Sequence, residues 1–179
     1  MRIVIAVLVY AFWISGCVSS ARPLPADLQY LPPADLVNAA SVRGSKEVTK
    51  SKLIADRAAV IFNIDGKRNP YLAVSETKKR EDNSTKPVYL APGKHQLSVI
   101  YVMGGHITRP VNLDFVAKPN TDYEVRFNTD IGIGWNSRNT YADFWVVDLS
   151  SSKVVSPIVR GFTPPRASPT YIPIIVPSR

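Results

Sequence analysis

The fold is decided by Ala59-Val60-Ile61-Phe62-Asn63-Ile64-Asp65-Gly66-Lys67, a run of β-branched and aromatic residues that ends in a turn signal. Side chains of these types pack well on a pleated, half-buried surface. Asp-Gly is a favoured pair in tight turns between strands. The stretch therefore predicts a strand over residues 59–64 that is closed by a turn.

A longer strand is predicted over residues 95–103, after Pro92-Gly93, a pair that suits the centre of a type II turn. Every second residue from Leu97 to Met103 is apolar, and the intervening positions change from polar to apolar at Ile100. Because alternate side chains of a strand point to opposite faces, this pattern predicts a central strand that is covered on both faces at one end.

The rest of the middle region alternates in the same way, and no part of it shows a convincing helical period. Short strands separated by turn signals are typical of an antiparallel β-sandwich. We therefore predict an all-β sandwich of six to eight strands over residues 55–160, with a polar loop over 78–84. Besides those above, its strands are expected at 71–74, 88–90, 111–116, 123–128, 143–148 and 154–159.

Two motifs of this region resemble PEGA-like and transthyretin-like modules. They are Val60 to Lys67, a strand that ends in Asp-Gly, and Val88 to Val99, two strand segments joined by Pro-Gly-Lys-His. Phe144-Trp145-Val146-Val147-Asp148 with Val154-Val155 looks like the closing hairpin of small bacterial lipoproteins built on such modules. The polar loop between the two motifs is an insertion. The resemblance implies a sandwich fold and a role in binding or envelope assembly, without a catalytic set.

The N-terminal sequence predicts an exported protein. Arg2 is followed by an uncharged apolar run, residues 3–13, which is too short for a membrane span of about 20 residues. Ile14-Ser15-Gly16-Cys17 resembles the lipobox of bacterial lipoproteins, which implies that residues 1–16 are removed and that Cys17, the single cysteine, carries lipid. The alternatives are an ordinary secretory signal with an incidental cysteine, or an uncleaved segment. In that family the residue after the cysteine influences sorting, and Val18 implies the periplasmic face of the outer membrane.

Proline-rich segments flank the predicted sandwich. Residues 17–54 are expected to form a tether of about 35 Å that holds the domain off the membrane, with a possible short helix over 34–42. Residues 161–179 form a tail that ends in an apolar cluster containing Tyr171, Ile172, Ile174 and Ile175. The tail either packs on its own domain or is disordered, or it docks as an extended segment on a partner.

The formal net charge of +8 is compatible with anionic lipid headgroups, lipopolysaccharide or the cell-wall polymer as partners, and an exported location excludes nucleic acid. Most of the surplus charge lies in the flanking segments, so it predicts general surface attraction and not a dedicated site.

No constellation for catalysis or metal binding is visible. His95 and His106 are the only histidines, and without a free thiol they make a poor zinc site. No nucleophile elbow occurs. Gly132-Ile133-Gly134 lacks the context of a nucleotide loop. Asp143 and Asp148, five residues apart on one strand, should point to opposite faces. No cofactor and no enzymatic activity are predicted, and a hydrolase is the weakest of the hypotheses.

The favoured hypothesis is a non-enzymatic lipoprotein that binds an envelope protein, such as an accessory subunit of a secretion or envelope assembly. The alternative is a module that binds glycan or lipopolysaccharide through an aromatic loop and its basic residues. The candidate contacts are Trp135, Arg138 and Tyr141 in the loop over 131–141, and the apolar cluster of the tail.

Overall fold

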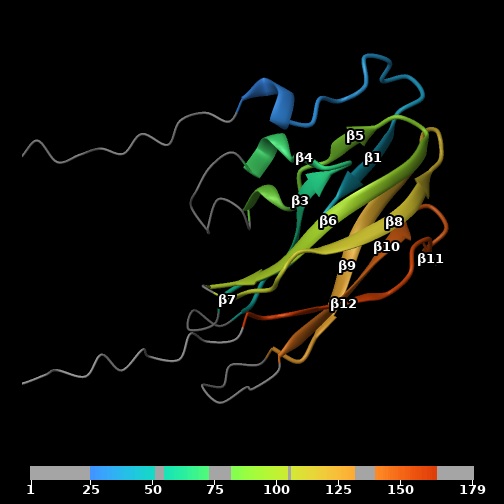
Figure 1. Ribbon diagram of the computed structural model, residues 1–179. Coiled ribbons are helices and arrows are strands. Elements are labelled where there is room, and N and C mark those ends of the chain that lie inside the picture. Colours follow the sequence, from blue (N-terminus) through green and yellow to red (C-terminus); the bar gives the residue numbers. More distant parts are fainter. Residues whose placement is uncertain (1–24, 51–54, 73–81, 105, 132–139, 165–179) are drawn as a thin grey trace, which may run out of the picture.

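The computed structural model describes residues 25–50, 55–72, 82–104, 106–131 and 140–164, and these form an all-β sandwich (Figure 1). The predicted all-β sandwich is confirmed, but the described residues form twelve strands and not the six to eight expected, because several strands have only two to four residues. Among the described residues, 3-10 turns occur at η2 (Ala26–Leu28) and η3 (Pro70–Leu72), and residues 82 and 83 are α-helical. The strands are β1 (Ala40–Arg43), β2 (Ser45–Glu47), β3 (Arg57–Ile64), β4 (Lys67–Arg68), β5 (Val88–Leu90), β6 (Gly93–Met103), β7 (His106–Ile107), β8 (Val111–Ala117), β9 (Asp122–Thr129), β10 (Tyr141–Asp148), β11 (Lys153–Val154) and β12 (Val159–Phe162).

The strands form two sheets of six strands each. Sheet A has the order β2-β3-β6-β7, with β4 also paired to β3 and β8 also paired to β6. Sheet B has the order β11-β10-β9-β1-β5, with β12 also paired to β10. The strand pairs are antiparallel except β1–β9, which is parallel. The sandwich is therefore mixed at one position, where β1 enters sheet B beside a strand far away in the sequence.

The stretch that begins with β3 folds as a hairpin with β4. Asp65 and Gly66 form its two-residue turn with φ angles of 51° and 77°, and two positive values are what a type I′ hairpin turn requires. β3 carries an irregularity between Ile61 and Asn63, where its register with β6 shifts. This bulge explains why Ile61 and Ile64, three residues apart, both face the core.

β6 is buried on both faces over its second half, as its sequence predicts. Leu97, Val99, Tyr101 and Met103 point into the main core between the sheets. Ile100 and Val102 belong to a second, smaller cluster on the outer side of sheet A. That cluster also contains Leu72 of η3, so the 3-10 turn covers this part of the outer face.

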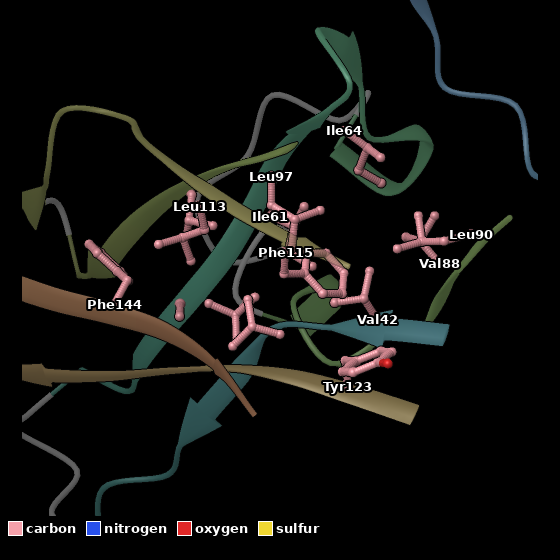
Figure 2. Close-up of a cluster of buried hydrophobic side chains, with 14 of the residues drawn as sticks. Val42, Ile61, Ile64, Val88, Leu90, Leu97, Leu113, Phe115, Tyr123 and Phe144 are labelled. Atoms are coloured by element: carbon pink, nitrogen blue, oxygen red, sulfur yellow. The ribbon is translucent and has the colours of Figure 1, made fainter. Parts of the chain in front are cut away.

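The main core lies between the two sheets (Figure 2). Sheet A contributes Leu113 and Phe115 of β8, and sheet B contributes Phe144 of β10. Phe115 packs edge-on against Tyr123 with ring centroids 5.1 Å apart. Full burial of one large apolar side chain contributes about 1.5–3 kcal/mol, so this layer supplies the main driving force for the fold.

The folded domain begins earlier than the sequence predicts. β1 and β2 lie inside the range 17–54 that was predicted as tether, and β1 occupies part of the predicted helix 34–42. Tyr30, earlier still, is 9% exposed and belongs to the main core. β1 has four residues and β2 has three, which is too short for a clear alternation of apolar and polar residues. The nearby prolines therefore favour a tether when the sequence is considered alone.

Two further expectations were wrong. The segment predicted as a strand at 71–74 begins in η3, and residues 73 and 74 lie outside the described residues. The predicted last strand, 154–159, is divided into β11 and β12, which are separated by Pro157. Proline lacks the N–H needed for a strand ladder, so it accounts for the break. β12 continues to Phe162, beyond the predicted boundary at 160.

Candidate functional site

Of the predicted contact residues, only Tyr141 lies within the described residues. Trp135 and Arg138 of the loop are outside them, and so is Cys17. The apolar residues of the tail, Tyr171, Ile172, Ile174 and Ile175, are outside them too. The site is therefore built outward from Tyr141, the first residue of β10.

Tyr141 is not an open stacking platform, because Arg160 of β12 covers its ring. The guanidinium carbon of Arg160 lies 3.7 Å from the ring centroid of Tyr141. The same guanidinium donates two hydrogen bonds of 2.7 Å to the carboxylate of Asp143, through Nε and Nη2. Aromatic ring, cation and carboxylate thus form one ordered group, in which the paired donors fix the plane of the guanidinium.

A second ordered group lies further along the same face of sheet B. Glu124 of β9 accepts from Arg43 Nε at 3.3 Å and from Arg126 Nε at 3.0 Å, so two guanidinium groups share one carboxylate. Trp145 of β10 stands directly opposite Arg126 in the β9–β10 register. The outer face of sheet B comprises the two ordered groups and Trp145 between them: Tyr141, Asp143, Arg160, Trp145, Arg43, Glu124 and Arg126.

Strand alternation places all of these side chains on one side of the sheet. In β10 the residues between them, Ala142, Phe144 and Val146, are fully buried in the core. The pairing Asp143↔Arg160 joins β10 to β12, and Arg43↔Glu124 joins β1 to β9. The outer face of sheet B therefore extends across four strands whose register is set by the core beneath it.

The cations on this face are more exposed than the anions. The side chains of Arg43, Arg126 and Arg160 are 45%, 47% and 49% exposed, whereas those of Glu124 and Asp143 are 17% each. The two hydrogen bonds from Arg160 hold the pKa of the Asp143 carboxyl below its usual value. The carboxylates thus lie beneath the guanidinium groups, which present their remaining N–H donors to solvent.

Exposed apolar side chains border the two ordered groups. Phe162 pairs with Tyr141, Val154 pairs with Val147, and Tyr89 of β5 pairs with Ser41 of β1. Phe162 is 51% exposed, Val154 54% and Tyr89 41%. Tyrosine, tryptophan and arginine are the residue types enriched at the energetic centres of protein interfaces. The outer face of sheet B therefore has the composition of a recognition surface.

The other candidates have structural roles. His95 lies 2.7 Å from Asp65 Oδ2 through Nδ1 and 2.7 Å from the Ala91 carbonyl oxygen through Nε2, and so joins the β3–β4 turn to the segment before β6. His106 begins β7 and is exposed. Asp143 and Asp148 point to opposite faces, as their spacing predicts. Within the described ranges, no group of three or more His, Cys, Asp and Glu side chains is placed to hold a metal ion.

Reasoning from sequence missed most of this surface. The surface combines residues of separate strands: Arg126, Trp145 and Arg160. From the sequence, Trp145 is predicted only to belong to a closing hairpin. The available signal was the alternation Tyr141, Asp143, Trp145, which puts polar and aromatic residues together on the solvent side of a strand. The registers of β10 with β9 and with β12 bring these residues next to arginines. These registers cannot be deduced from the sequence alone.

Comparison with protein-family models, with curated proteins and with solved structures finds no match. The resemblance to PEGA-like and transthyretin-like modules and to bacterial lipoproteins stays a prediction from the motifs themselves. Among the described residues, no helix has the length and apolar character needed to cross a membrane.

Proposed function

We propose that this chain is a non-enzymatic, lipid-anchored envelope protein that faces the periplasm and binds an envelope protein through the outer face of sheet B. The anchor is Cys17, and its support is the lipobox Ile14-Ser15-Gly16-Cys17 after a short apolar run. The outer membrane is the proposed location, because Val18 and not aspartate follows the cysteine. An accessory subunit of a secretion or envelope assembly is the most specific form of this proposal.

The observation that carries the proposal is the set of three half-exposed guanidinium groups on the outer face of sheet B. Each is oriented by a carboxylate that is itself only 17% exposed, with Trp145 between the two ordered groups. A side chain already held in one conformation loses little entropy when it binds, so such arginines favour a defined contact. Their free N–H donors suit carboxylates on the partner.

The proposal is tested by cross-linking in membranes and recovery of the tagged full chain. Trp145→Ala combined with Arg126→Ala should abolish recovery of a partner protein that the unsubstituted chain recovers. Val116→Ala is the matched control, because Val116 is 54% exposed on β8 of sheet A. Equal recovery by both variants would exclude this face. A chain that ends at Pro169 tests the tail separately, and Cys17→Ser should release the protein from membranes.

A second candidate function is binding of an acidic glycan or of lipopolysaccharide. The observation that favours it is charge: within the two ordered groups, three guanidinium groups face two carboxylates, which leaves one positive charge for an external anion. Phosphate and carboxylate groups match the planar donors of arginine. If no protein is recovered, binding of purified lipopolysaccharide that falls with salt and is lost on Arg43→Ala would favour this function.

A further inference from the structure

Residues 25–39, which precede β1, are attached to the sandwich through Tyr30. Tyr30 donates its backbone N–H to the Arg68 carbonyl at 2.8 Å and its hydroxyl to the Tyr89 carbonyl at 3.1 Å. Its ring packs in the main core, and burial raises the pKa of its hydroxyl, with Asp65 adding to the effect. Residues 25–39, here called the N-terminal segment, therefore have a fixed place beside β4 and β5.

The N-terminal segment exposes apolar side chains that the core does not use. Leu28 is 50% exposed, Leu31 70%, Leu36 55% and Val37 80%. The Val37 N–H donates to Asp35 Oδ1 at 2.9 Å, which orders the turn that carries Val37. These four side chains lie within ten consecutive residues, 28–37, and concentrated exposed apolar surface marks sites of contact with proteins or membranes.

The distance to the anchor decides between these two kinds of contact. Pro25 is the first described residue, and the eight peptide units from Cys17 to Pro25 span at most about 29 Å when fully extended. As a flexible coil they would span about 16 Å. A lipid on Cys17 therefore keeps the N-terminal segment close to the bilayer. Figure 1 shows this segment at the end of the sandwich opposite β12.

We infer that the N-terminal segment lies on the lipid surface, with Leu31, Leu36 and Val37 in the headgroup region, and that the β12 end points away from the membrane. This inference rests on the anchor of the proposed function. The tether is then residues 17–24 and not the expected 17–54, so the domain lies directly on the bilayer. Exposed apolar side chains that reach the boundary between headgroups and acyl chains are removed from water, as on the apolar face of an interfacial helix.

The charges near the segment indicate that the contact is apolar. Asp27 and Asp35 of the segment, with Asp65 of the adjacent turn, carry three negative charges, and Lys67 and Arg68 of β4 carry two positive charges, so the formal local charge is only −1. Attraction to anionic headgroups is therefore weak, and salt should have little effect on the contact.

The test compares two positions of matched exposure. Residues 17–179, which include every described residue, carry Cys17→Ser and an N-terminal histidine tag that binds nickel-chelating lipid in phosphatidylethanolamine–phosphatidylglycerol vesicles. Leu36→Cys or Phe162→Cys then supplies the single thiol for a fluorophore, and these side chains are 55% and 51% exposed. Quenching by nitroxide headgroups should be about threefold or more greater at position 36, and should persist in about 0.5 M salt.

Adding Leu31→Ser and Val37→Ser should lower quenching at position 36 to the level at position 162. Both side chains are exposed, so circular dichroism should show an unchanged fold. Equal quenching at the two positions, or no effect of the serine substitutions, would overturn the inference. Because the tag replaces the lipid, the result does not depend on acylation. Mass spectrometry of the N-terminal peptide of the natural protein shows whether Cys17 carries lipid, and so tests the proposed anchor separately.

Discussion

At the scale of single residues, Asp148 is a carboxylate whose state should control stability in acid. It is 7% exposed at the end of β10. The Ser150 hydroxyl donates to it at 2.7 Å, and the backbone N–H groups of Ser150 and Ser151 donate at 2.9 Å and 3.2 Å. These hydrogen bonds, with that of the Ser150 hydroxyl first, lower the pKa of Asp148 from 3.8 to about 2.

We predict that Asp148→Asn destabilises the protein at neutral pH and that most of this effect is lost near pH 2, where about half of the folded-state carboxyl is protonated. A carboxyl whose folded pKa is depressed stabilises the fold above its unfolded pKa of about 3.9, and that contribution is lost as the pH falls toward 2. Urea unfolding at about pH 6 and at about pH 2 measures both states. Asp27→Asn is the control, since no described hydrogen bond involves the exposed Asp27 side chain. An Asp148→Asn deficit that persists at low pH would show that the charge is irrelevant.

Of the residues on the outer face of sheet B, Tyr141 is the one that the sequence predicts as a contact residue. Tyr141 was selected because aromatic residues beside a basic loop suit recognition, and it does lie on the outer face of sheet B. Its partner Arg160 is nineteen positions later in the chain, and only the antiparallel β10–β12 pairing brings the two together. Residue type is enough to select Tyr141 as a candidate. Its contact with Arg160 depends on the register of β10 with β12, which residue type does not reveal.

At the scale of elements, Gly44 is the point where the chain passes from sheet B to sheet A. It stands between β1 and β2, and its N–H donates to the Ser84 carbonyl at 2.7 Å. A methyl group at this position would lie 2.1 Å from the Ala59 carbonyl oxygen and 2.8 Å from that of Ser84. Both are backbone atoms of neighbouring segments, so the crossing requires the absence of a side chain.

Gly44→Ala should therefore lower the free energy of unfolding by about 3 kcal/mol, because the backbone of β3 must move. Gly66→Asn is the matched control. A methyl group there meets nothing within 4 Å, and asparagine tolerates its φ of 77°, so the change should stay within about 1 kcal/mol. Thermal and urea unfolding of both variants give the comparison. A Gly44→Ala protein as stable as the control would mean that the crossing is not close-packed.

The elements that the sequence predicted best are those with a long alternation and a buried face. β3, β6, β8, β9 and β10 all fall within a few residues of their predicted ranges. The bulge in β3 was not foreseeable, because it changes which positions face the core without changing residue types. β1 and β2 were missed because each is too short to show a period, and their stability comes from neighbouring strands distant in sequence.

At the scale of the whole molecule, the domain extends over the described residues from Pro25 to Pro164 and not over 55–160. β1 lies between β9 and β5 in sheet B and supplies Ala40 and Val42 to the core. Without it, β5 has no partner strand in sheet B. Without residues 161 and 162, β12 also loses half of its pairing with β10. The shorter chain thus lacks both a core segment and a continuous sheet.

We predict that residues 25–164 unfold cooperatively, with the same midpoint as the chain from residue 17, and that residues 55–160 do not. Burial of fully enclosed side chains such as Val42 contributes about 1.5–3 kcal/mol each, while a typical domain is stable by only about 5–15 kcal/mol. Losing β1 together with Tyr30 therefore removes a large part of the total. Circular dichroism melts and the dispersion of amide resonances distinguish the two outcomes. A cooperative transition in residues 55–160 would show that β1 is an accessory strand, and that the N-terminal segment joins an already stable sandwich.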